Sequence, residues 1–443
     1  MKHLLTIIFI TGAIAYSFGQ QPISLSDAIQ TGLDNNYQIQ IAERRIDISK
    51  NNNTMAAAGA LPRITGNLNS NNSFLINNSP ASILNGKTLG SIGLTPSVDM
   101  TWVLFDNYKV QINKQRFDEL EEQSKGNSDL VIENTIHAII LAYYRGVIEQ
   151  QKINIFQEVM ELSRDRYDYE LENRKIGTGS TFNVVQVKDA YWTDSTNLLR
   201  QQTFYQSAIR NLNLAMGEDD LNQPYTLVDS INFNPQPYAF ETLKRKMLES
   251  NRTLNNQLLN QRLLKSNTQF QQSNEWYMPR VSMSTGLSQD LSYNNDFTPT
   301  VGFGNFSGAG LQFNYYLRFA VSFNLFDAGT SKRAIQNALV EERIGELSIS
   351  DQKRTLSGEL SNQLASYQDQ LRFIQLNEEL IVNAAQNLGI SEERYRRSLI
   401  NSFDYRNVQL AYLRASLTKL ENIYTLKTIE AELTRLTGGI VTE

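Results

Sequence analysis

The chain has 443 residues, with 46 acidic and 41 basic side chains, no cysteine, nine prolines and a mean hydropathy of -0.38. The absence of cysteine excludes disulfide scaffolds, cysteine-based zinc and iron–sulfur sites, thiol catalysis and a lipid anchor on an N-terminal cysteine. The small acidic excess, with no basic block, argues against nucleic-acid partners. The low mean hydropathy would be typical of a soluble protein, but such an average misses strands in which apolar and polar residues alternate.

The first segment, residues 1–19, is predicted to be a signal peptide. Lys2 precedes an apolar stretch over 4–15, and Ser17 and Gly19 have the spacing of small residues at a cleavage site. This stretch is shorter than the ~20 residues that a membrane-spanning helix needs, and an uncleaved interfacial anchor is the alternative. No later segment has about 18 consecutive apolar residues, so a helical membrane protein is not expected.

Two long stretches, 97–223 and 300–443, contain no proline and are rich in helix-forming residues. In the second, apolar residues recur every seven positions and predict a coiled-coil stripe. The stripe consists of Leu360, Tyr367, Ile374, Ile381, Leu388 and Tyr395, with Leu356, Leu364, Leu371 and Ala385 in the neighbouring seam. The first stretch has apolar residues at a spacing of three and four: Ile132, Ile136, Ile139, Tyr143 and Val147. An ordinary packed helical bundle would show the same periodicity.

The two halves of the chain resemble each other. A shift of 221 positions places Phe105-Asp106 on Phe326-Asp327, Phe182 on Phe403 and Gly217 on Gly438. Further upstream the shift is slightly smaller and places Pro62 on Pro279. The sequence therefore predicts an internal duplication, with a first repeat over 20–217, a linker over 218–238 and a second repeat over 239–443.

Each repeat is predicted to contain a pair of strands followed by two long helices. The strand signal is alternation of apolar and polar residues, with polar, glycine-containing loops between the paired strands. The expected strands are at about 62–75, 91–105, 280–291 and 311–326, and the expected long helices are at about 107–176, 181–216, 328–397 and 403–437.

Two interpretations compete for these strands. In a soluble protein one apolar face would pack on the helices, whereas in an outer membrane the apolar residues would face lipid and the polar residues a watery lumen. The signal peptide, the strand lengths and aromatic residues near the strand ends favour the membrane: Trp102, Phe105, Tyr315, Tyr316, Phe319 and Phe326. Four strands cannot close a transmembrane barrel, and open edges are not tolerated in lipid, so several chains would have to share one barrel.

The duplicated order of helix, proline, strand pair, Phe-Asp, very long helix, tight turn and long helix resembles the TolC family of bacterial outer-membrane efflux and secretion channels. The resemblance covers essentially the whole mature chain. It implies an α+β membrane protein: a homotrimer with a twelve-stranded β-barrel, to which each chain gives four strands, continued by a long periplasmic α-helical barrel. The helix expected from Asn107 to Ile176 would be about 105 Å long.

The same resemblance implies location, partners and function. The chain would lie in the outer membrane of a Gram-negative bacterium, in contact with outer-membrane lipid and with its helical part in the periplasm. It would be the passive exit duct of a tripartite efflux or type I secretion system, joined to a periplasmic adaptor protein and an inner-membrane transporter. The resemblance is compatible with two processes, drug efflux and protein secretion.

The turns between the long helices are where the family's adaptors dock. The resemblance assigns this role to Gly177, Thr178, Gly179 and Ser180 in the first turn and to Ser398, Leu399, Ile400 and Asn401 in the second. Both glycines of the first turn can take a positive φ, and Ser180, Thr181, Asn401 or Ser402 can cap the following helix. The chain departs from the family pattern at Arg174, where an aromatic residue is usual, and at Ser398, where glycine is usual.

Just beyond the second turn, the family has two aspartates three residues apart at a constricted entrance. Asp404 matches the first, the second falls on Asn407, and Asn183 is the equivalent residue of the first repeat. In a trimer, Asp404 would supply three carboxylates at one height, which would attract cations. The alternative is a solvated carboxylate that favours the N-terminus of its helix.

Catalysis is not expected. His137, the only histidine after the predicted signal peptide, lies in an apolar helical stripe, where a packing role is favoured. The segment 302–310 looks like a phosphate loop but precedes an alternating strand, so a mobile extracellular loop is expected. No cofactor or metal site is indicated. The alternative to a channel is an exported coiled-coil structural or adhesive protein with β-hairpin insertions.

Overall fold

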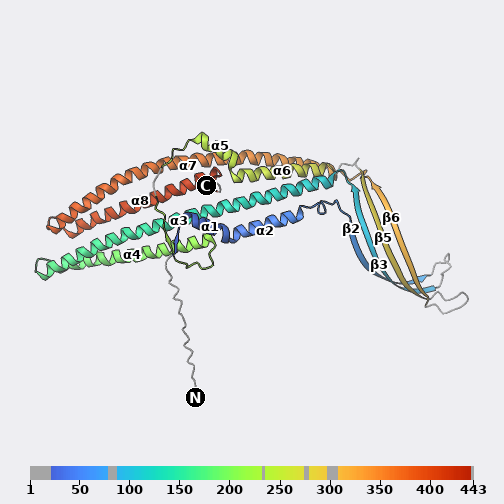
Figure 1. Ribbon diagram of the computed structural model, residues 1–443, viewed down its shortest axis with the longest axis horizontal. Coiled ribbons are helices and arrows are strands. Elements are labelled where there is room, and N and C mark those ends of the chain that lie inside the picture. Colours follow the sequence, from blue (N-terminus) through green and yellow to red (C-terminus); the bar gives the residue numbers. More distant parts are fainter. Residues whose placement is uncertain (1–20, 78–86, 232–234, 274–278, 297–307, 441–443) are drawn as a thin grey trace, which may run out of the picture. The chain divides into compact units, whose positions relative to one another are not determined.

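The structure is a computed structural model that describes residues 21–77, 87–231, 235–273, 279–296 and 308–440 (Figure 1). The predicted signal peptide, 1–19, lies outside the described residues. The first half contains β1 (Gln21–Ile23), α1 (Leu25–Asn35), α2 (Tyr37–Asn52), β2 (Arg63–Asn77), β3 (Lys87–Phe105), α3 (Lys109–Lys175), α4 (Thr181–Met216) and β4 (Tyr225–Leu227). The second half contains α5 (Phe240–Ser250), α6 (Arg252–Gln272), β5 (Arg280–Asp296), β6 (Gly308–Ser322), α7 (Thr330–Arg396) and α8 (Ser402–Leu436).

The elements of the two halves correspond in length and in local packing. Helices α3 and α7 each have 67 residues, and α4 and α8 have 36 and 35. Asn36 follows α1 and donates its side-chain amide to the carbonyl of Ala215 at 3.0 Å, and Asn251 follows α5 and donates to the carbonyl of Leu436 at 3.0 Å. Each half therefore ties its short helix to the end of its own long hairpin in the same way. The segment expected to be a linker, 218–238, contains β4, which pairs in parallel with β1.

The described chain forms two compact units. The first consists of Met1–Ala42, Ser128–Leu254 and Gln352–Glu443, and the second of Glu43–Asn127 and Asn255–Asp351. Each unit contains segments from both halves of the sequence, because α3 and α7 contribute to both units.

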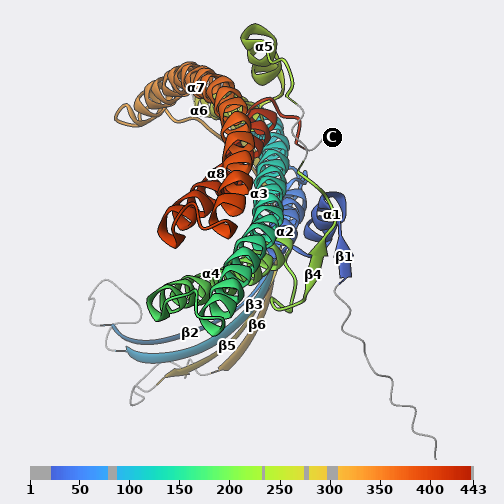
Figure 2. The same cartoon turned by 90° about the vertical axis from the view of Figure 1, so that its left-hand side faces the viewer.

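The core of the first unit is built from the apolar stripe of α3 and from apolar residues of α4, α1, β1 and β4. Ile139, Tyr143 and Leu212 are fully buried beside α1, β1 and β4, which Figure 2 shows next to one another. The Tyr143 hydroxyl bonds the Ile23 carbonyl at 3.0 Å and the Asp229 carboxylate at 2.8 Å. The stripe expected on α7 is also buried at Leu360, Tyr367, Ile374, Leu388 and Tyr395, whereas Ile381 is half-buried and Ala385 is exposed.

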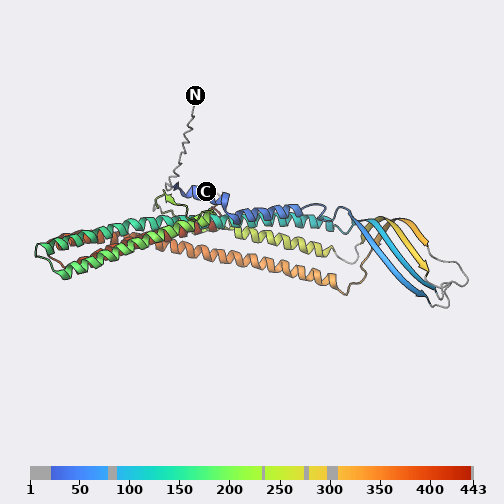
Figure 3. The same cartoon turned by 90° about the horizontal axis from the view of Figure 1, so that it is seen from below.

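The second unit contains a four-stranded antiparallel sheet in the order β2-β3-β5-β6 (Figure 3). The four strands of this sheet, beside the long helices, agree with the predicted α+β class. The sheet extends further into the expected loops than the alternation predicts: β3 begins at Lys87 rather than 91, and β5 ends at Asp296 rather than 291. The reason is that backbone pairing does not need apolar side chains.

The last strand is displaced relative to its prediction. β6 covers Gly308–Ser322 rather than 311–326, so that the end of the expected strand lies outside it. Gly308, which was expected in a mobile loop, pairs with Asn294 in the sheet, and residues 302–307 of that loop lie outside the described residues.

The two faces of the sheet differ in polarity. Apolar side chains such as Leu68, Leu287 and Tyr315 are exposed on one face. On the other, Asp99 accepts a hydrogen bond from the Tyr316 hydroxyl at 2.8 Å, across the intervening strand β5. Glycine at position 286 makes room for this bond, because a Cβ there would lie 2.7 Å from the Tyr316 ring. Among the described residues, no helix has both the length and the apolarity needed to cross a bilayer.

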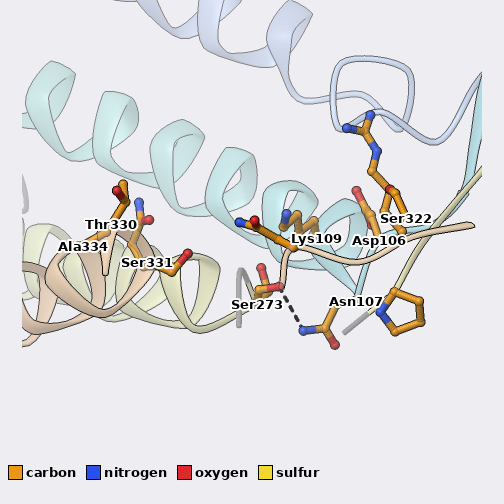
Figure 4. Close-up of a pocket in the computed structure, with 12 residues that line it drawn as sticks. Asp106, Asn107, Lys109, Ser273, Ser322, Thr330, Ser331 and Ala334 are labelled. Carbon is orange, nitrogen blue, oxygen red and sulfur yellow. Dashed lines mark hydrogen bonds between the residues drawn. The ribbon is translucent and has the colours of Figure 1, made fainter. Parts of the chain in front are cut away.

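Each sheet hairpin passes into its long helix through two consecutive left-handed residues. Asn107 and Tyr108 have φ of 57° and 62°, and Ala328 and Gly329 have φ of 54° and 77°. This geometry immediately precedes the long helix, and Asp327 accepts the backbone N–H of Ser331 at 2.7 Å at the start of α7. A pocket of about 350 Å³ lies at this junction, where the Asn107 amide donates to the Ser273 carbonyl at 3.0 Å (Figure 4).

Candidate functional site

The first helical turn joins α3 to α4. Gly177 has φ of 83°, and nothing lies within 4 Å of the place that its Cβ would take, so the conformation rather than the space requires glycine. Gly179 does not have a positive φ, but a Cβ there would lie 2.8 Å from the backbone nitrogen of Arg174. Ser180 caps α4, since its hydroxyl accepts the N–H of Asn183 at 3.1 Å.

The second turn, between α7 and α8, has the same construction from different residues. Ser398 has φ of 55° and so occupies the left-handed place that Gly177 occupies in the first turn. Asn401 caps α8, since its side-chain oxygen accepts the N–H of Asp404 at 2.9 Å. Of the four residues expected as possible caps, the structure selects Ser180 and Asn401.

The structure brings some of the predicted site residues together and separates others. Asn183, Ser398, Ile400 and Asn401 line one cavity of about 310 Å³, to which the ends of α3 and α4 and the second turn contribute. The remaining residues predicted for the tips and the entrance are not among the lining of this cavity: Gly177, Thr178, Gly179, Ser180, Leu399, Asp404 and Asn407. Asp404 and Asn407 are both exposed and lie one helical turn apart on α8.

The surface of the turns combines exposed apolar side chains with basic ones. Phe182 is 74% exposed and Phe403 is 61% exposed, and they occupy equivalent positions in the two halves. Lys175 pairs with Glu172 at 2.5 Å and Arg396 with Glu392 at 2.8 Å. Exposed aromatic residues within a charged surface are typical of a protein-binding site.

A buried polar cluster joins the two hairpins behind the turns, and sequence reasoning missed it. Arg406 of α8 makes a bidentate ion pair with Asp194 of α4, at 2.6 and 2.7 Å. The Ser163 hydroxyl donates to the same carboxylate at 2.5 Å, and the Gln409 amide donates to the Ser163 hydroxyl at 2.9 Å. These residues belong to three helices that no local pattern relates, so the sequence carried no signal for their contact.

Nearer the turns, tyrosines connect the hairpins. The Tyr395 hydroxyl donates to Glu170, and the Tyr395 ring stacks on Tyr405 with centroids 5.2 Å apart. The guanidinium of Arg166 lies 5.6 Å from the centroid of the Tyr405 ring. Burial raises the pKa of Tyr405 to about 12 and raises that of Tyr395, so both hydroxyls stay protonated at neutral pH. The heptad stripe signalled the buried position of Tyr395 but not its partner.

His137 lies away from these turns on α3, with its Nε2 3.4 Å from a Glu432 oxygen. Burial lowers the pKa of His137, so the ring is neutral at pH 7 and the contact is not an ion pair there. This geometry agrees with the packing role expected for the residue.

The comparisons with known proteins agree with the resemblance. A family described as outer membrane efflux protein matches residues 243–439. A membrane protein from Pseudomonas aeruginosa superimposes with a TM-score of 0.75 at 14% identity, covering 94% of this chain and 92% of that one. The Campylobacter jejuni CmeC outer membrane channel has a TM-score of 0.73 at 13% identity (94% and 85% covered). The Vibrio cholerae outer membrane protein VceC has a TM-score of 0.72 at 13% identity (94% and 96% covered).

No curated protein sequence matches the chain significantly. The family match and the fold likeness nevertheless point the same way, and the resemblance to the TolC family is confirmed. Residues 243–439 match the outer membrane efflux protein family, and the chain as a whole shares the fold of the TolC-type outer-membrane channels.

Proposed function

We propose that this chain forms, as a homotrimer, the exit duct of a tripartite efflux or type I secretion system in the outer membrane of a Gram-negative bacterium. The observation that carries the proposal is the four-stranded sheet, which has one exposed apolar face, one polar face and two edges that no other described strand covers. Such a sheet suits a wall that separates lipid from a watery lumen, provided that other copies close it. The outer membrane efflux family assignment of residues 243–439 supports the same function.

The helices support assembly of several copies. Within the first unit, α3 contacts α8 through the ion pairs of Arg145 and Lys152 with Glu421. The helices on either side of this pair carry exposed apolar residues: Val185, Trp192 and Leu199 on α4, and Phe373, Leu380 and Ile390 on α7. Two unlike apolar faces on one chain suit head-to-tail association, which closes into a ring when the rotation between copies allows it.

The two turns would be the docking site for a periplasmic adaptor. The exposed Phe182 and Phe403 would supply apolar contact, and the surrounding arginines and lysines would pair with acidic groups of the partner. An inner-membrane transporter would deliver the cargo through this adaptor. The chain itself would supply a passage and perform no chemistry, as in the channels of its family.

Asp404 would form the entrance ring of the duct. Its side chain is exposed and its backbone is held by the Asn401 cap, so a trimer would present three carboxylates at one level. Asn407, one turn further along, and Asn183, at the equivalent place in the first turn, would add polar but uncharged groups. Such a ring would favour cations at the entrance.

Membrane fractionation with electrophoresis tests the proposal. Outer-membrane trimers that resist SDS until they are heated, and loss of export on deletion that the intact chain restores, are the expected results. Soluble monomers would overturn the proposal and would favour the exported coiled-coil protein, an alternative that the comparisons do not support. The variant Phe182→Asp with Phe403→Asp should keep the trimer but lose export, because it changes only the proposed docking surface.

A further inference from the structure

Among the described residues, each of the two edge strands of the sheet pairs with one neighbouring strand only. β2 and β6 each have 15 residues, and they lie at opposite ends of the strand order. In hydrocarbon, each unpaired backbone N–H or C=O group costs several kcal/mol, so these edges need a partner of matching length. In a closed barrel built from copies of this chain, β6 of one copy meets β2 of the next.

The two hairpins of the sheet repeat each other residue by residue. In the first, Arg63 lies opposite Thr101, and in the second, Arg280 lies opposite Ser322. Adding 217 to each residue number of β2 gives its counterpart in β5, and adding 221 to each residue number of β3 gives its counterpart in β6. With these shifts, the residue pairs of the first hairpin become those of the second. The shift of 221 is the one that also relates Phe105-Asp106 to Phe326-Asp327.

The contact between the two hairpins provides a template for the contact between copies. Within the chain, β3 pairs with β5, with Met100 opposite Thr285 and Leu94 opposite Leu291. Under the same shifts, β3 corresponds to β6 and β5 corresponds to β2. Met100 opposite Thr285 thus becomes Val321 opposite Leu68, and Leu94 opposite Leu291 becomes Tyr315 opposite Phe74.

We infer that β6 of one copy pairs antiparallel with β2 of the next copy in this register. The pairs on the apolar face are Val321 with Leu68, Phe319 with Ser70, Leu317 with Asn72, Tyr315 with Phe74 and Phe313 with Ile76. The inference rests on the proposed function, because it requires that copies of this chain close one barrel. It goes beyond that function by assigning which residues meet at the seam.

The side chains on the two edges fit this register. Exposed apolar residues, among them Val321, Tyr315 and Phe74, fall on the face that would meet lipid. The alternate positions bring Ser322 opposite Asn67 and Arg318 opposite Asn71, which are polar pairs suited to the lumen. A slip by one residue would exchange the faces and place Arg318 towards lipid. A slip by two residues keeps the faces, so only an experiment at residue resolution distinguishes it.

Cysteine pairs test the register, because the chain has no cysteine of its own. The matched variant carries Val321→Cys with Leu68→Cys, and the two shifted controls carry Val321→Cys with Gly66→Cys or with Ser70→Cys. Directly opposite Cα atoms in a sheet are about 5 Å apart, and a two-residue slip along the strand adds about 7 Å of displacement. Disulfides need Cα atoms within about 7 Å, so the shifted pairs should not close. A second matched pair, Arg318→Cys with Asn71→Cys, samples the opposite face.

After oxidation in isolated outer membranes, at least one matched variant should migrate as a crosslinked trimer instead of a monomer on non-reducing gels of boiled samples. Addition of a reductant should restore the monomer band. Since every chain carries both cysteines, the ring closes covalently. Crosslinking of a shifted control in place of both matched pairs would overturn the register. Intact trimers in which no pair crosslinks would overturn pairing of β6 with β2. Absence of trimers without oxidation would instead contradict the proposed function.

Discussion

The turn between α3 and α4 and the turn between α7 and α8 share one backbone geometry but not one set of residues. Gly177 and Ser398 both take a left-handed conformation, although serine has a Cβ that disfavours it. Ser180 and Asn401 both cap the next helix. The difference teaches that the backbone path of the turn tolerates substitution as long as each position keeps its local role.

In the Tyr395–Glu170 and Arg406–Asp194 contacts behind the turns, the two hairpins contribute different groups. The first hairpin supplies the acidic groups, Glu170 and Asp194, whereas the second supplies Tyr395 and Arg406. Only the second turn has a carboxylate, Asp404, at the position where the first has an asparagine. The hairpins are therefore alike in backbone and complementary in side chains, and the predictions below change one property at a time.

The largest effect is expected at the ion pair that joins the hairpins. Arg406→Leu leaves the buried Asp194 carboxylate without its cation and should lower the free energy of unfolding by about 3–5 kcal/mol. Denaturant unfolding followed by circular dichroism in detergent measures it. The control is Arg406→Leu with Asp194→Leu, which should recover most of the loss because no charge is left unpaired. A single variant as stable as the parent chain would contradict this account of the cluster.

Substitutions at the two left-handed positions should change the free energy of unfolding in opposite directions. Gly177→Ala should cost about 1–2 kcal/mol, because a Cβ is unfavourable at positive φ and no contact can compensate for it. Ser398→Gly should stabilise by less than about 1 kcal/mol, since glycine relieves the strain but loses more chain entropy. The same unfolding measurement compares the two variants. Changes in the free energy of unfolding that have the same sign in both would show that the turns differ in backbone geometry.

The helix caps should contribute about equally in the two turns. Ser180→Ala and Asn401→Ala each remove an oxygen that accepts a backbone N–H, and each should cost about 1 kcal/mol. Thr181→Ala serves as the control, because the structure does not use that hydroxyl as the cap. A loss at only one of the two caps would break the equivalence of the turns.

The charge difference between the turns should appear in conduction. Asp404→Asn removes one carboxylate per chain and should weaken the preference for cations in planar bilayers, as measured by the reversal potential in a salt gradient. Asn183→Asp is the matched variant, which adds the missing carboxylate to the first turn and should strengthen the preference. An unchanged reversal potential for Asp404→Asn would remove this residue from the entrance.

A smaller, pH-dependent effect is expected on α3, where Glu133 corresponds to Arg354 of α7. Burial raises the pKa of Glu133, so the folded state binds a proton more readily than the unfolded state. Stability from this group is present at low pH and is lost as pH rises through the folded pKa. Glu133→Gln should therefore gain stability relative to the parent chain as pH increases from about 4 to 8. Unfolding midpoints of both proteins at several pH values measure the gain. A difference between variant and parent that does not change with pH would argue against a raised pKa of Glu133.

Local features of the fold were predictable from particular residues. The Phe-Asp pairs indicated where strands give way to helices, and Asp327 indeed accepts hydrogen bonds from the first turn of α7. The heptad stripe indicated that Leu360 and Ile374 are buried. Glycine-rich sequence was a poorer guide: Gly308 belongs to β6, because a neighbouring strand satisfies its backbone regardless of side chain.

Contacts between distant segments were not predictable in the same way. Asp194 and Arg406 are 212 positions apart, and each alone looks like an ordinary charged residue of an amphipathic helix. Tyr316 reaches Asp99 only because Gly286 lies between them on the intervening strand. A periodic pattern reports which face of an element is buried but not which element covers it.

The sequence by itself determined the types of element, the positions of the turns and the resemblance to outer-membrane channels, because these depend on periodicity, on helix-breaking and capping residues and on their order along the chain. The tertiary structure decided how far the strands extend, that β3 lies beside β5, and which side chains join the two hairpins. The physical reason is that backbone pairing and buried ion pairs depend on which segments meet in space, and local sequence patterns do not specify that meeting.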